Sequence, residues 1–460
     1  MTCITRLARV ALLGFLSIAA ACGSSGDGVA SAPTPADRPS DDTTAPADGG
    51  SADGATARND AADATLPVAK GNPGTLDVSF GTGGVFDFSS FGKGEIDHVL
   101  ERAGGYVFAG TTHDSAGDSL QLGGVTTAGA LDTGFGAGGR TIVRVGADLR
   151  FDRAHQLVAV PGAGWLVAGK VQDQAALVRF GASGALLTAF GTGGVASVQT
   201  ASGGESFGAL RLADGSFVAV VKRDITLGTF EYDLRAFSAT GATLDARSKI
   251  SASFFSSTFE ARNGGLWVLA GVPAARSNGS QSFAARYSPP GAFAIFSASP
   301  NPDYPSVTPT DGIFAGAYKS ISTVIDGGKT LVLSIAGTGN TDHLVRVDAG
   351  TGALDTAYGA AGKVALSFPT ATLRILLAVD EAGRAIVALR DNTSFVTTLV
   401  RFDAAGQRDL SFGGTGQLTI PFSVTCARID PAGRLIVAGA KVTNTPGGSD
   451  TAMRIARVNL

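Results

Sequence analysis

A short phrase recurs along this chain and constrains its fold more than any other feature. At residues 76–85 it reads Leu-Asp-Val-Ser-Phe-Gly-Thr-Gly-Gly-Val, and clear copies follow at 131–139, 186–194, 354–359 and 409–413. With weaker copies near residues 244 and 293, successive starts lie 49 to 61 residues apart. Such a period is typical of repeat architectures, in which small units build one body. The repeat therefore outweighs the length of 460 residues, which alone would suggest about three domains.

Each unit contains four short segments that are apolar or that alternate apolar and polar residues, separated by Gly, Asp and Asn turns. Examples are residues 140–145, 165–169 and 176–180. Period-two runs of this length predict antiparallel strands, and Asp214-Gly215 predicts a primed hairpin turn in which Gly takes a positive φ. Seven units of four strands predict an all-β, seven-bladed β-propeller of four-stranded antiparallel blades, because stacked open sheets would leave long edges.

Four features together resemble the delta-60 repeat propellers of bacterial surface and secreted proteins. They are the Leu-Asp-x-Ser-Phe-Gly-x-Gly-Gly phrase, the Asp-Gly hairpin, a Val-Ala-Gly strand and an Arg-Phe/Tyr strand, and they cover residues 76–460. By analogy with WD-repeat propellers, the phrase leads into the outermost strand of each blade. The first strand, near residues 85–88, then completes the last blade with residues 454–458 and closes the ring. The units opening at 243–247 and 289–293 depart from the phrase and should be least regular.

The phrase also repeats an aromatic residue and an aspartate. We expect the aromatic residues to be buried between neighbouring blades, and they are Phe80, Phe135, Phe190, Tyr358 and Phe412. The repeated aspartates are Asp77, Asp132, Asp355 and Asp409. They suit Asx turns; a ring of metal-binding carboxylates is the alternative, which we disfavour because equivalent positions in successive blades are too far apart to share one ion.

The N-terminal sequence predicts export and membrane attachment. Arg6 and Arg9 precede a short apolar run that ends at Cys22, so residues 1–21 are typical of a secretory signal peptide. The small residues before Cys22 resemble a bacterial lipobox, which implies lipidation of Cys22; cleavage near Ala21 with an incidental Cys22 is the alternative. Residues 22–70 form an Ala/Asp/Ser/Thr/Pro/Gly tether expected to be disordered. Gly23 after the cysteine implies an outer-membrane destination, on the periplasmic or surface face.

Composition excludes several functions. The formal net charge of -3 predicts no basic face and no nucleic-acid partner. The four histidines have no paired ligand spacing, and Cys426 stands alone in residues 71–460, so we expect no metal site, no cofactor and no disulfide there. Cys426 is read as a small buried residue. Trp165 and Trp267 suggest a glycan platform, but their alignment with Tyr106 and Phe217 favours packing between blades.

The mouth of the central channel is the candidate site, because strand entrances converge there. Its candidate residues form a mixed-sign set suited to a zwitterionic or extended polar ligand: Asp97, Arg153, Glu205, Glu260, Lys319 and Arg374. A solvated rim is the alternative reading of the same residues.

Two classes of function remain open. The first is a non-catalytic, membrane-anchored monomer of the cell envelope that binds a protein or glycan, and we favour it. The second is a propeller enzyme, a hydrolase or lyase acting at the channel. Two histidines, or a histidine and a carboxylate, meeting in the channel would favour the enzyme, and His98 and His155 are the pair to check.

Overall fold

The strands of this protein form antiparallel sheets of about four strands each. The computed structural model describes residues 71–460 except 116, 145–152, 199–202, 227–228, 253–260, 263–264, 274–279, 288–292, 298–317, 327–328, 337–341, 349–354, 367–371, 381 and 446–447. Residues 64–445 and 449–460 form one compact unit. The one helical element in its described part is a 3-10 turn, η1 (Ser89–Phe91). The signal peptide, Cys22 and the predicted tether lie outside the described residues.

Five of the sheets described have four strands that follow one another in chain order. They are β6 (Arg153–Val160) to β7 (Gly164–Val171), β8 (Gln174–Phe180) and β9 (Val195–Val198); β10 (Gly204–Arg211) to β11 (Phe217–Thr226), β12 (Thr229–Phe237) and β13 (Thr243–Ala252); β14 (Ala261–Arg262) to β15 (Gly265–Pro273), β16 (Ser280–Tyr287) and β17 (Phe293–Ser297); β18 (Tyr318–Asp326) to β19 (Lys329–Ala336), β20 (Asp342–Asp348) and β21 (Lys363–Leu366); and β22 (Thr372–Val379) to β23 (Ala385–Asp391), β24 (Thr397–Phe402) and β25 (Gln417–Ile420).

A sixth sheet joins the two ends of the described chain. It contains β26 (Ser423–Ile429), β27 (Arg434–Thr445), β28 (Gly448–Asn459), β2 (Lys93–Arg102), β3 (Gly105–Asp114), β4 (Gly117–Thr126) and β5 (Arg140–Val143), in that order. The strand β1 (Val85–Asp87) pairs antiparallel with β28, with Val85 opposite Ala456. A single residue pair, Lys93 with Ala452, links β2 to β28. The first strand of the chain therefore pairs with the last strand, as the sequence predicted.

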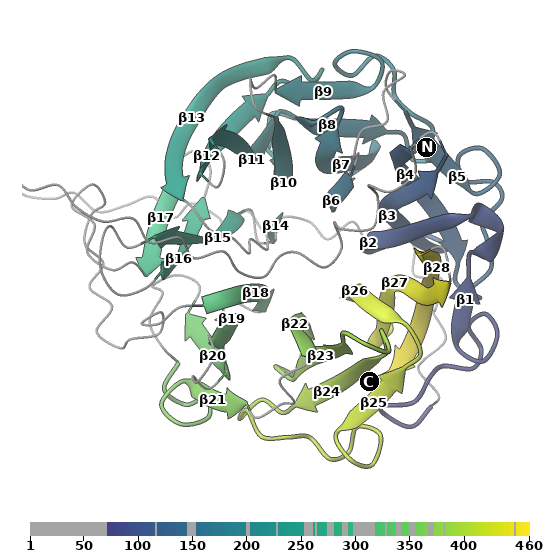
Figure 1. The fold of residues 1–460 in the computed structure, drawn as a ribbon, viewed down its shortest axis with the longest axis vertical. Helices are drawn as coiled ribbons and strands as arrows, with labels where there is room; N and C mark the ends of the chain where they lie inside the picture. Colours follow the sequence, from purple (N-terminus) through teal and green to yellow (C-terminus); the bar gives the residue numbers. More distant parts are fainter. Residues whose placement is uncertain are drawn as a thin grey trace, which may run out of the picture. The chain divides into compact units, whose positions relative to one another are not determined.

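The first strands of several consecutive sheets are neighbours. Contacts join β26 to β2, β2 to β6, β6 to β10, β18 to β22, and β22 to β26. In Figure 1 the first strands β2, β6, β22 and β26 lie nearest the middle of the described body, whereas the fourth strands β5, β9 and β25 lie at its edge. The phrase leads into these fourth strands, since residues 131–139 directly precede β5. The predicted order of strands within a unit is confirmed.

The repeated aromatic residue of the phrase is buried in each copy, as predicted: Phe80, Phe135, Phe190, Tyr358 and Phe412 are at most 4% exposed. Phe135 belongs to one buried hydrophobic cluster with Leu122 of its own unit and with Trp165 and Phe180 of the next. The glycine that follows each aromatic donates its N–H to the next unit, as Gly136 does to Ser183 O at 2.7 Å. The phrase therefore fills the space between successive sheets, and Trp165 belongs to that packing.

The repeated aspartate makes two different contacts with its two carboxylate oxygens. Oδ1 accepts the amide two residues later, at 3.1 Å for Asp77 and Ser79 and at 3.0 Å for Asp409 and Ser411. This is the predicted Asx turn. Oδ2 accepts a hydrogen bond from Nε of an arginine on the third strand, and those pairs are Arg346–Asp355 at 2.8 Å, Arg401–Asp409 at 2.9 Å and Arg457–Asp77 at 2.7 Å.

The same arginines stack on the aromatic residue of the phrase. The guanidinium carbons lie 4.5, 4.8 and 4.9 Å from the ring centroids of Tyr358, Phe412 and Phe80, respectively. A guanidinium over an aromatic face gains a cation–π attraction that grows when the pair is desolvated. Aspartate, arginine and aromatic residue thus form one joint between the third strand and the phrase.

Two units alter this joint in ways that their sequences explain. In the third copy Leu187 replaces the aspartate, and Arg179 donates instead to the carbonyls of Trp165, Phe180 and Ala163 at 2.7 to 2.9 Å. In the second copy the arginine position is Gly124, whose backbone carbonyl accepts the Asp132 amide. Arg102 at the end of β2 takes over, pairing with Asp132 and lying 5.3 Å from the Phe135 ring.

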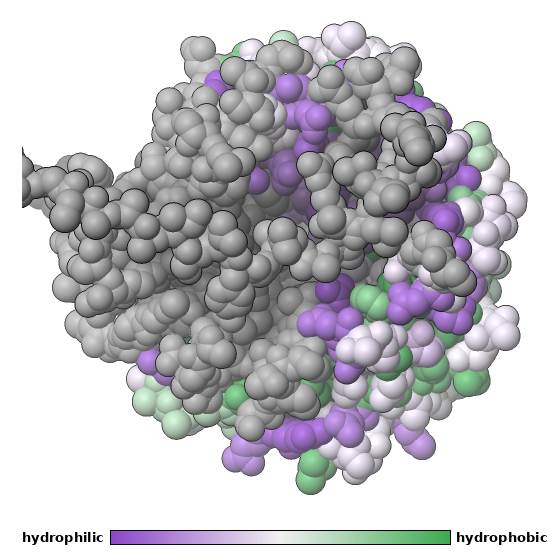
Figure 2. All heavy atoms as spheres, in the orientation of Figure 1, coloured by the Kyte–Doolittle hydropathy of each residue, from purple (hydrophilic) through white to green (hydrophobic). Residues whose placement is uncertain are grey.

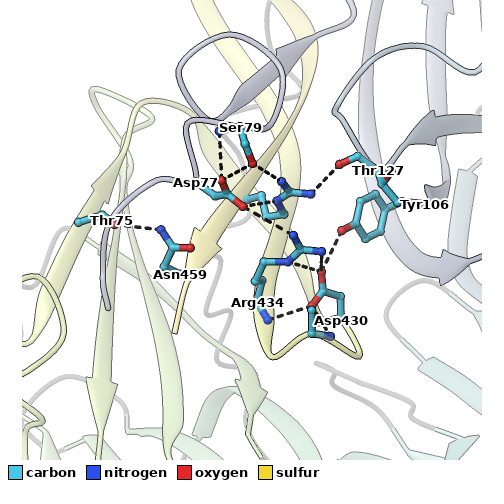
Figure 3. A network of polar contacts seen from close by, with 10 residues as sticks. Thr75, Asp77, Ser79, Tyr106, Thr127, Asp430, Arg434 and Asn459 are labelled. Carbon is cyan, nitrogen blue, oxygen red and sulfur yellow. Dashed lines mark hydrogen bonds and ion pairs between the residues drawn. The ribbon is translucent and has the colours of Figure 1, made fainter. Parts of the chain in front are cut away.

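The joint at the first copy connects the two ends of the chain, and Figure 3 shows it with its neighbours. Asp77 Oδ2 accepts from Arg457 and lies 3.7 Å from Nη1 of Arg434. Arg434 in turn pairs with Asp430, whose Oδ2 accepts the Tyr106 hydroxyl at 2.9 Å. Residues from the phrase, β3, β27 and β28 therefore share one buried polar network, which we call the clasp.

One local prediction was wrong. The hairpin at Asp214-Gly215 is not a primed turn, because Gly215 has a φ of 84° but Asp214 keeps a negative φ. Asp214 Oδ1 instead accepts the Ser216 amide at 2.9 Å, which favours a longer Asx-type hairpin. A primed turn occurs where no glycine signalled it, at Gln172 and Asp173 with φ of 51° and 60°.

Candidate functional site

Four of the first strands carry one extra residue at the same distance from their hairpin. The pairing register shifts between Ile96 and His98 in β2, between Ala154 and Gln156 in β6, between Ser206 and Gly208 in β10, and between Val424 and Cys426 in β26. The extra residues are Asp97, His155, Phe207 and Thr425. Such bulges bend a strand and redirect a side chain, and they are common beside binding sites.

The bulge explains the glycine of the Val-Ala-Gly strand. A Cβ on Gly110 would lie 2.1 Å from the Glu95 carbonyl oxygen, and one on Gly169 would lie 2.1 Å from that of Arg153. A Cβ on Gly439 would lie 2.0 Å from the Ser423 carbonyl oxygen. The bulged first strand approaches the second too closely for any side chain there. This part of the repeat therefore preserves the bulge.

Five polar residues at the start of β2, β6 and β10 gather around two of these bulges, and we call them the inner-strand cluster: Glu95, Asp97, Arg153, His155 and Glu205. Arg153 Nη2 lies 3.3 Å from Glu95 Oε1, which joins β6 to β2. His155 Nε2 lies 3.3 Å from Glu205 Oε2, which joins β6 to β10. Acidic residues on β2 and β10 thus flank the basic residues on β6. The cluster is thus a mixed-sign polar surface shared by three neighbouring sheets.

Asp97 has little to balance its charge. Within the described residues its carboxylate accepts one hydrogen bond, from Thr111 Oγ1 at 3.4 Å. Burial raises the pKa of Asp97 well above its usual range, the neighbouring Glu95 charge raises it further, and Arg153 and Thr111 oppose the shift only in part. Desolvation disfavours the charged carboxylate more than these partners favour it.

Glu205 shows the opposite balance. Burial alone would raise its pKa, but the hydrogen bond and charge of His155, with the charges of Lys222 and Lys170, lower it to about 2. Glu205 is therefore ionised at neutral pH, whereas Asp97 ionises at a cost. The pKa of one carboxyl group in the cluster is raised and that of another is lowered, and shifted pKa values of this kind are common at functional sites.

The structure brings together three of the six residues predicted for the channel mouth: Asp97, Arg153 and Glu205. Lys319 lies at a bulge in β18, between Tyr318 and Ser320, and Arg374 pairs with Leu389 in the β22–β23 ladder, but their side chains lie outside the described part. Glu260 also lies outside it. Glu95 was missed, although its position two residues before Asp97 on the same strand was a usable signal.

The two histidines singled out from the sequence have different surroundings. His155 meets a carboxylate, which is one of the contacts named above as favouring catalysis. His98 instead has a buried Nδ1 with no hydrogen-bond partner among the described residues. Burial and the nearby Arg428 lower the pKa of His98 to about 4, so it is neutral at physiological pH.

Cys426 lies beside the cluster on β26. Its thiol is half-buried, and burial together with the Asp97 charge raises its pKa. A thiol held in its protonated form is a poor nucleophile. The sequence predicted a small buried residue at Cys426; the side chain is half-buried instead, although its raised pKa does not favour a reactive thiol.

The cluster's end of the sheets also contains strained turns. Antiparallel pairing places the turn between the second and third strands at the end where the first strand begins. Gln172 and Asp173 in the β7–β8 turn, and Phe395 in the β23–β24 turn, have positive φ without being glycine. Asp173 O accepts the Gly204 amide at 2.8 Å, which ties this turn to the start of β10 beside Glu205. Strain of this kind is concentrated at functional surfaces.

Within the described part of the chain, no three His, Cys, Asp or Glu side chains are placed to hold a metal ion. None of its helices is long and apolar enough to cross a membrane. On the face drawn in Figure 2, hydrophilic residues gather toward the middle as well as along the edge.

No protein family matches the sequence, and no curated protein sequence matches it. Solved structures that are similar include a prolyl endopeptidase (10% identity, TM-score 0.42, covering 80% of this chain and 51% of that one), an acylaminoacyl peptidase of Pyrococcus horikoshii (11%, 0.40, 80% and 53%) and the hydrazine synthase of Kuenenia stuttgartiensis (10%, 0.43, 75% and 92%).

This chain spans about half the length of the two peptidases that it matches. At these identities the likeness says nothing about activity, and TM-scores below 0.5 leave the fold to be judged from the strands themselves. Those strands define a class: an all-β protein whose antiparallel sheets of about four strands are like the blades of a β-propeller.

Proposed function

We propose that this protein is a non-catalytic binding scaffold of the cell envelope, tethered to the outer membrane, which presents the inner-strand cluster to a protein or glycan. The cluster carries the proposal. Its charged side chains come from three sheets and form ion pairs between neighbouring first strands. They lie at or beside bulges, and glycines of the repeat preserve the bulges in β2 and β6. A surface that served packing alone would not need this arrangement at the same register in neighbouring sheets.

The proposal includes a seven-bladed ring that is closed by the first strand, of the kind found in delta-60 repeat propellers. Pairing of β1 with β28 supports it, as do the contacts between consecutive first strands. In such a ring the eight-stranded sheet would comprise two blades, linked by the pair Lys93 and Ala452. The inner-strand cluster would then face a central channel.

Attachment to the membrane through Cys22 rests on the sequence. The apolar run that ends in small residues before Cys22, and the polar segment 23–70 that follows, support a lipidated N-terminus on a long tether. Two or three acyl chains anchor stably because each buried methylene contributes about 0.8 kcal/mol. Mass spectrometry of the mature N-terminus tests this, and a Cys22→Ser variant that fractionates with the envelope as the wild type does would contradict it.

Capture from solubilised envelope tests the binding function. Full-length protein and an Arg153→Ala/Glu205→Gln variant are immobilised in parallel, and the retained molecules are compared quantitatively. We expect at least one component to be retained by the wild type and lost by the variant. Identical retention by the two proteins would overturn the proposal.

A second candidate, a hydrolase or lyase, is favoured by one observation, the contact of His155 with Glu205. A carboxylate that orients a histidine is a common part of acid–base catalysis. The fate of the captured component separates the two functions. Recovery of that component unchanged after prolonged incubation favours the scaffold, whereas conversion that a His155→Gln variant abolishes favours the enzyme.

A further inference from the structure

We propose that the first two units bind a carboxylate anion between them, through Nε of Arg102 and Nε1 of Trp165. Both nitrogens are buried N–H donors, and neither has an acceptor among the described residues. The Trp165 residue is only 7% exposed. Arg102 ends β2, whereas the inner-strand cluster lies toward the start of that strand. The site is therefore separate from the one proposed above and goes beyond that function.

The two donors lie at one junction between units, the junction that Phe135 fills. The guanidinium carbon of Arg102 is 5.3 Å from the centroid of the Phe135 ring. Trp165 belongs with Phe135 and Phe180 to one buried hydrophobic cluster. Buried polar groups nearly always have a hydrogen-bond partner. Two N–H donors without acceptors at the same junction therefore indicate a ligand that accepts hydrogen bonds.

The clasp is the corresponding junction between the last unit and the first, and it contains a carboxylate (Figure 3). Tyr106 is the second residue of β3, as Trp165 is of β7. The Tyr106 hydroxyl donates to Oδ2 of Asp430 at 2.9 Å, and Nε of Arg434 donates to the same oxygen at 2.9 Å. An aromatic donor and a guanidinium thus share one carboxylate there.

The first unit supplies no carboxylate at the corresponding place. Asp430 begins the turn of residues 430–434, which lies between the paired residues Ile429 and Leu435. The turn of the first unit, residues 102–105, is shorter and has no acidic side chain. The carboxylate of Asp132 already accepts from Arg102 Nη2 and from the Gly134 amide. The donors of the clasp therefore have counterparts at this junction, but Asp430 has none.

Charge favours an anion over a neutral acceptor at this site. Burial lowers the pKa of Arg102, so the environment disfavours its charged form despite the pair with Asp132. Hydrogen bonds between a charged donor and a charged acceptor are the stronger kind. A carboxylate offers two oxygens to two donors from separate side chains. A phosphate is a weaker match, because it would bring further negative charge toward Asp132.

Nuclear magnetic resonance of full-length protein with indole-¹⁵N-labelled tryptophan tests this inference, using sodium acetate as the probe. The chain has two tryptophans, Trp165 and Trp267. The Trp165 signal is assigned by its loss in Trp165→Phe, or by its persistence in Trp267→Phe if the first variant does not fold. Sodium chloride holds the ionic strength constant. We expect a saturable downfield shift of the Trp165 indole N–H, because Nε1 gains an anionic acceptor.

Two controls separate the site from a general effect of salt or solvent. Acetamide has nearly the shape of acetate without its charge, and it should bind about tenfold more weakly or worse. Arg102→Lys keeps the positive charge but lacks Nε–H, and it should weaken acetate binding by about tenfold. Arg408→Lys is the matched control, since Arg408 contacts Gln417 away from this junction, and it should leave the titration unchanged.

Three outcomes would overturn the inference: no saturable shift with acetate, equal titrations with acetate and acetamide, or wild-type affinity for acetate in Arg102→Lys. None of them bears on the inner-strand cluster, because capture of the envelope component is tested by Arg153→Ala/Glu205→Gln. Conversely, an acetate site without a captured component would count against the proposed function alone. The two proposals can therefore fail separately.

Discussion

Arg457 donates a hydrogen bond from Nε to Oδ2 of Asp77 at 2.7 Å, across 380 positions of the chain. The equivalent pairs Arg346–Asp355 and Arg401–Asp409 span only 9 and 8 positions. The two ends of the protein thus form the same joint that elsewhere connects residues close together in the sequence. The first phrase contacts the last strand through the same pair that the other copies make within their own units. Variants in the clasp therefore test whether the first strand is held by the last.

Replacing Asp77 by Asn should destabilise the protein by about 2 to 4 kcal/mol, because Arg457 would lose its carboxylate partner while staying buried. Arg434 would keep its shorter pair with Asp430 and lose only the 3.7 Å contact with Asp77. Asn still accepts the Ser79 amide through its side-chain oxygen, so the Asx turn remains. Chemical denaturation of full-length protein measures the loss.

Asp409→Asn is the control for this change, since it removes the same kind of pair from Arg401 within one unit. Both variants should lose stability, but only Asp77→Asn should make residues 71–90 sensitive to limited proteolysis. Equal cleavage patterns in the two variants would show that the clasp does not hold the first strand.

Gly169→Ala should cost about 2 to 3 kcal/mol, because the new Cβ would meet the Arg153 carbonyl oxygen at 2.1 Å and the bulge would have to shift. Gly193→Ala is the control. Gly193 has a positive φ, which Gly169 does not, but nothing lies within 4 Å of its Cβ position. Ala361 occupies the equivalent place in a later copy with a φ of 52°. That change should cost about 1 kcal/mol. Thermal and chemical unfolding of both variants measures the two losses of stability. A larger loss of stability for Gly193→Ala than for Gly169→Ala would contradict the role assigned to the bulge.

The strands and the burial of Phe80 and its counterparts could be predicted from the sequence, because both follow from the repeat. The sequence did not predict the bulges. One extra residue in a strand such as β2 leaves the alternation of apolar and polar residues almost unchanged, so only the pairing register reveals Asp97 and His155 as extra residues. The glycine of the Val-Ala-Gly strand was recognised in the sequence, but the reason for it is the close approach of the neighbouring bulged strand.

For the candidate site, Asp97, Arg153 and Glu205 could be named because strand entrances converge in repeat folds. The partner Glu95 and the contact of His155 with Glu205 could not be named, since they depend on which strand starts are neighbours. The joint of Arg457 with Asp77 was missed for a similar reason. Arg-Phe/Tyr and Leu-Asp were both recognised as motifs, but their pairing is a contact between strands.

The stability of the protein should fall as the pH drops from 6.5 to 4, in part through His98. Burial and Arg428 lower the pKa of His98 to about 4, so the folded state keeps a neutral imidazole. The unfolded chain binds a proton below about pH 6.5. Protons therefore favour the unfolded state within this window, by roughly 1 to 3 kcal/mol at its acidic end. His98→Gln should flatten the free energy of unfolding between pH 6.5 and 4, and an unchanged slope would contradict a buried neutral His98.

The claim that the inner-strand cluster binds the ligand is tested most directly by the dissociation constant of the captured envelope component. It is measured for full-length wild type, for Arg153→Ala/Glu205→Gln, and for Arg408→Ala, whose side chain contacts Gln417 away from the cluster. Loss of charged contacts of this kind should weaken binding by about tenfold or more in the double variant and leave Arg408→Ala at the wild-type value. Equal constants for all three proteins would contradict the account.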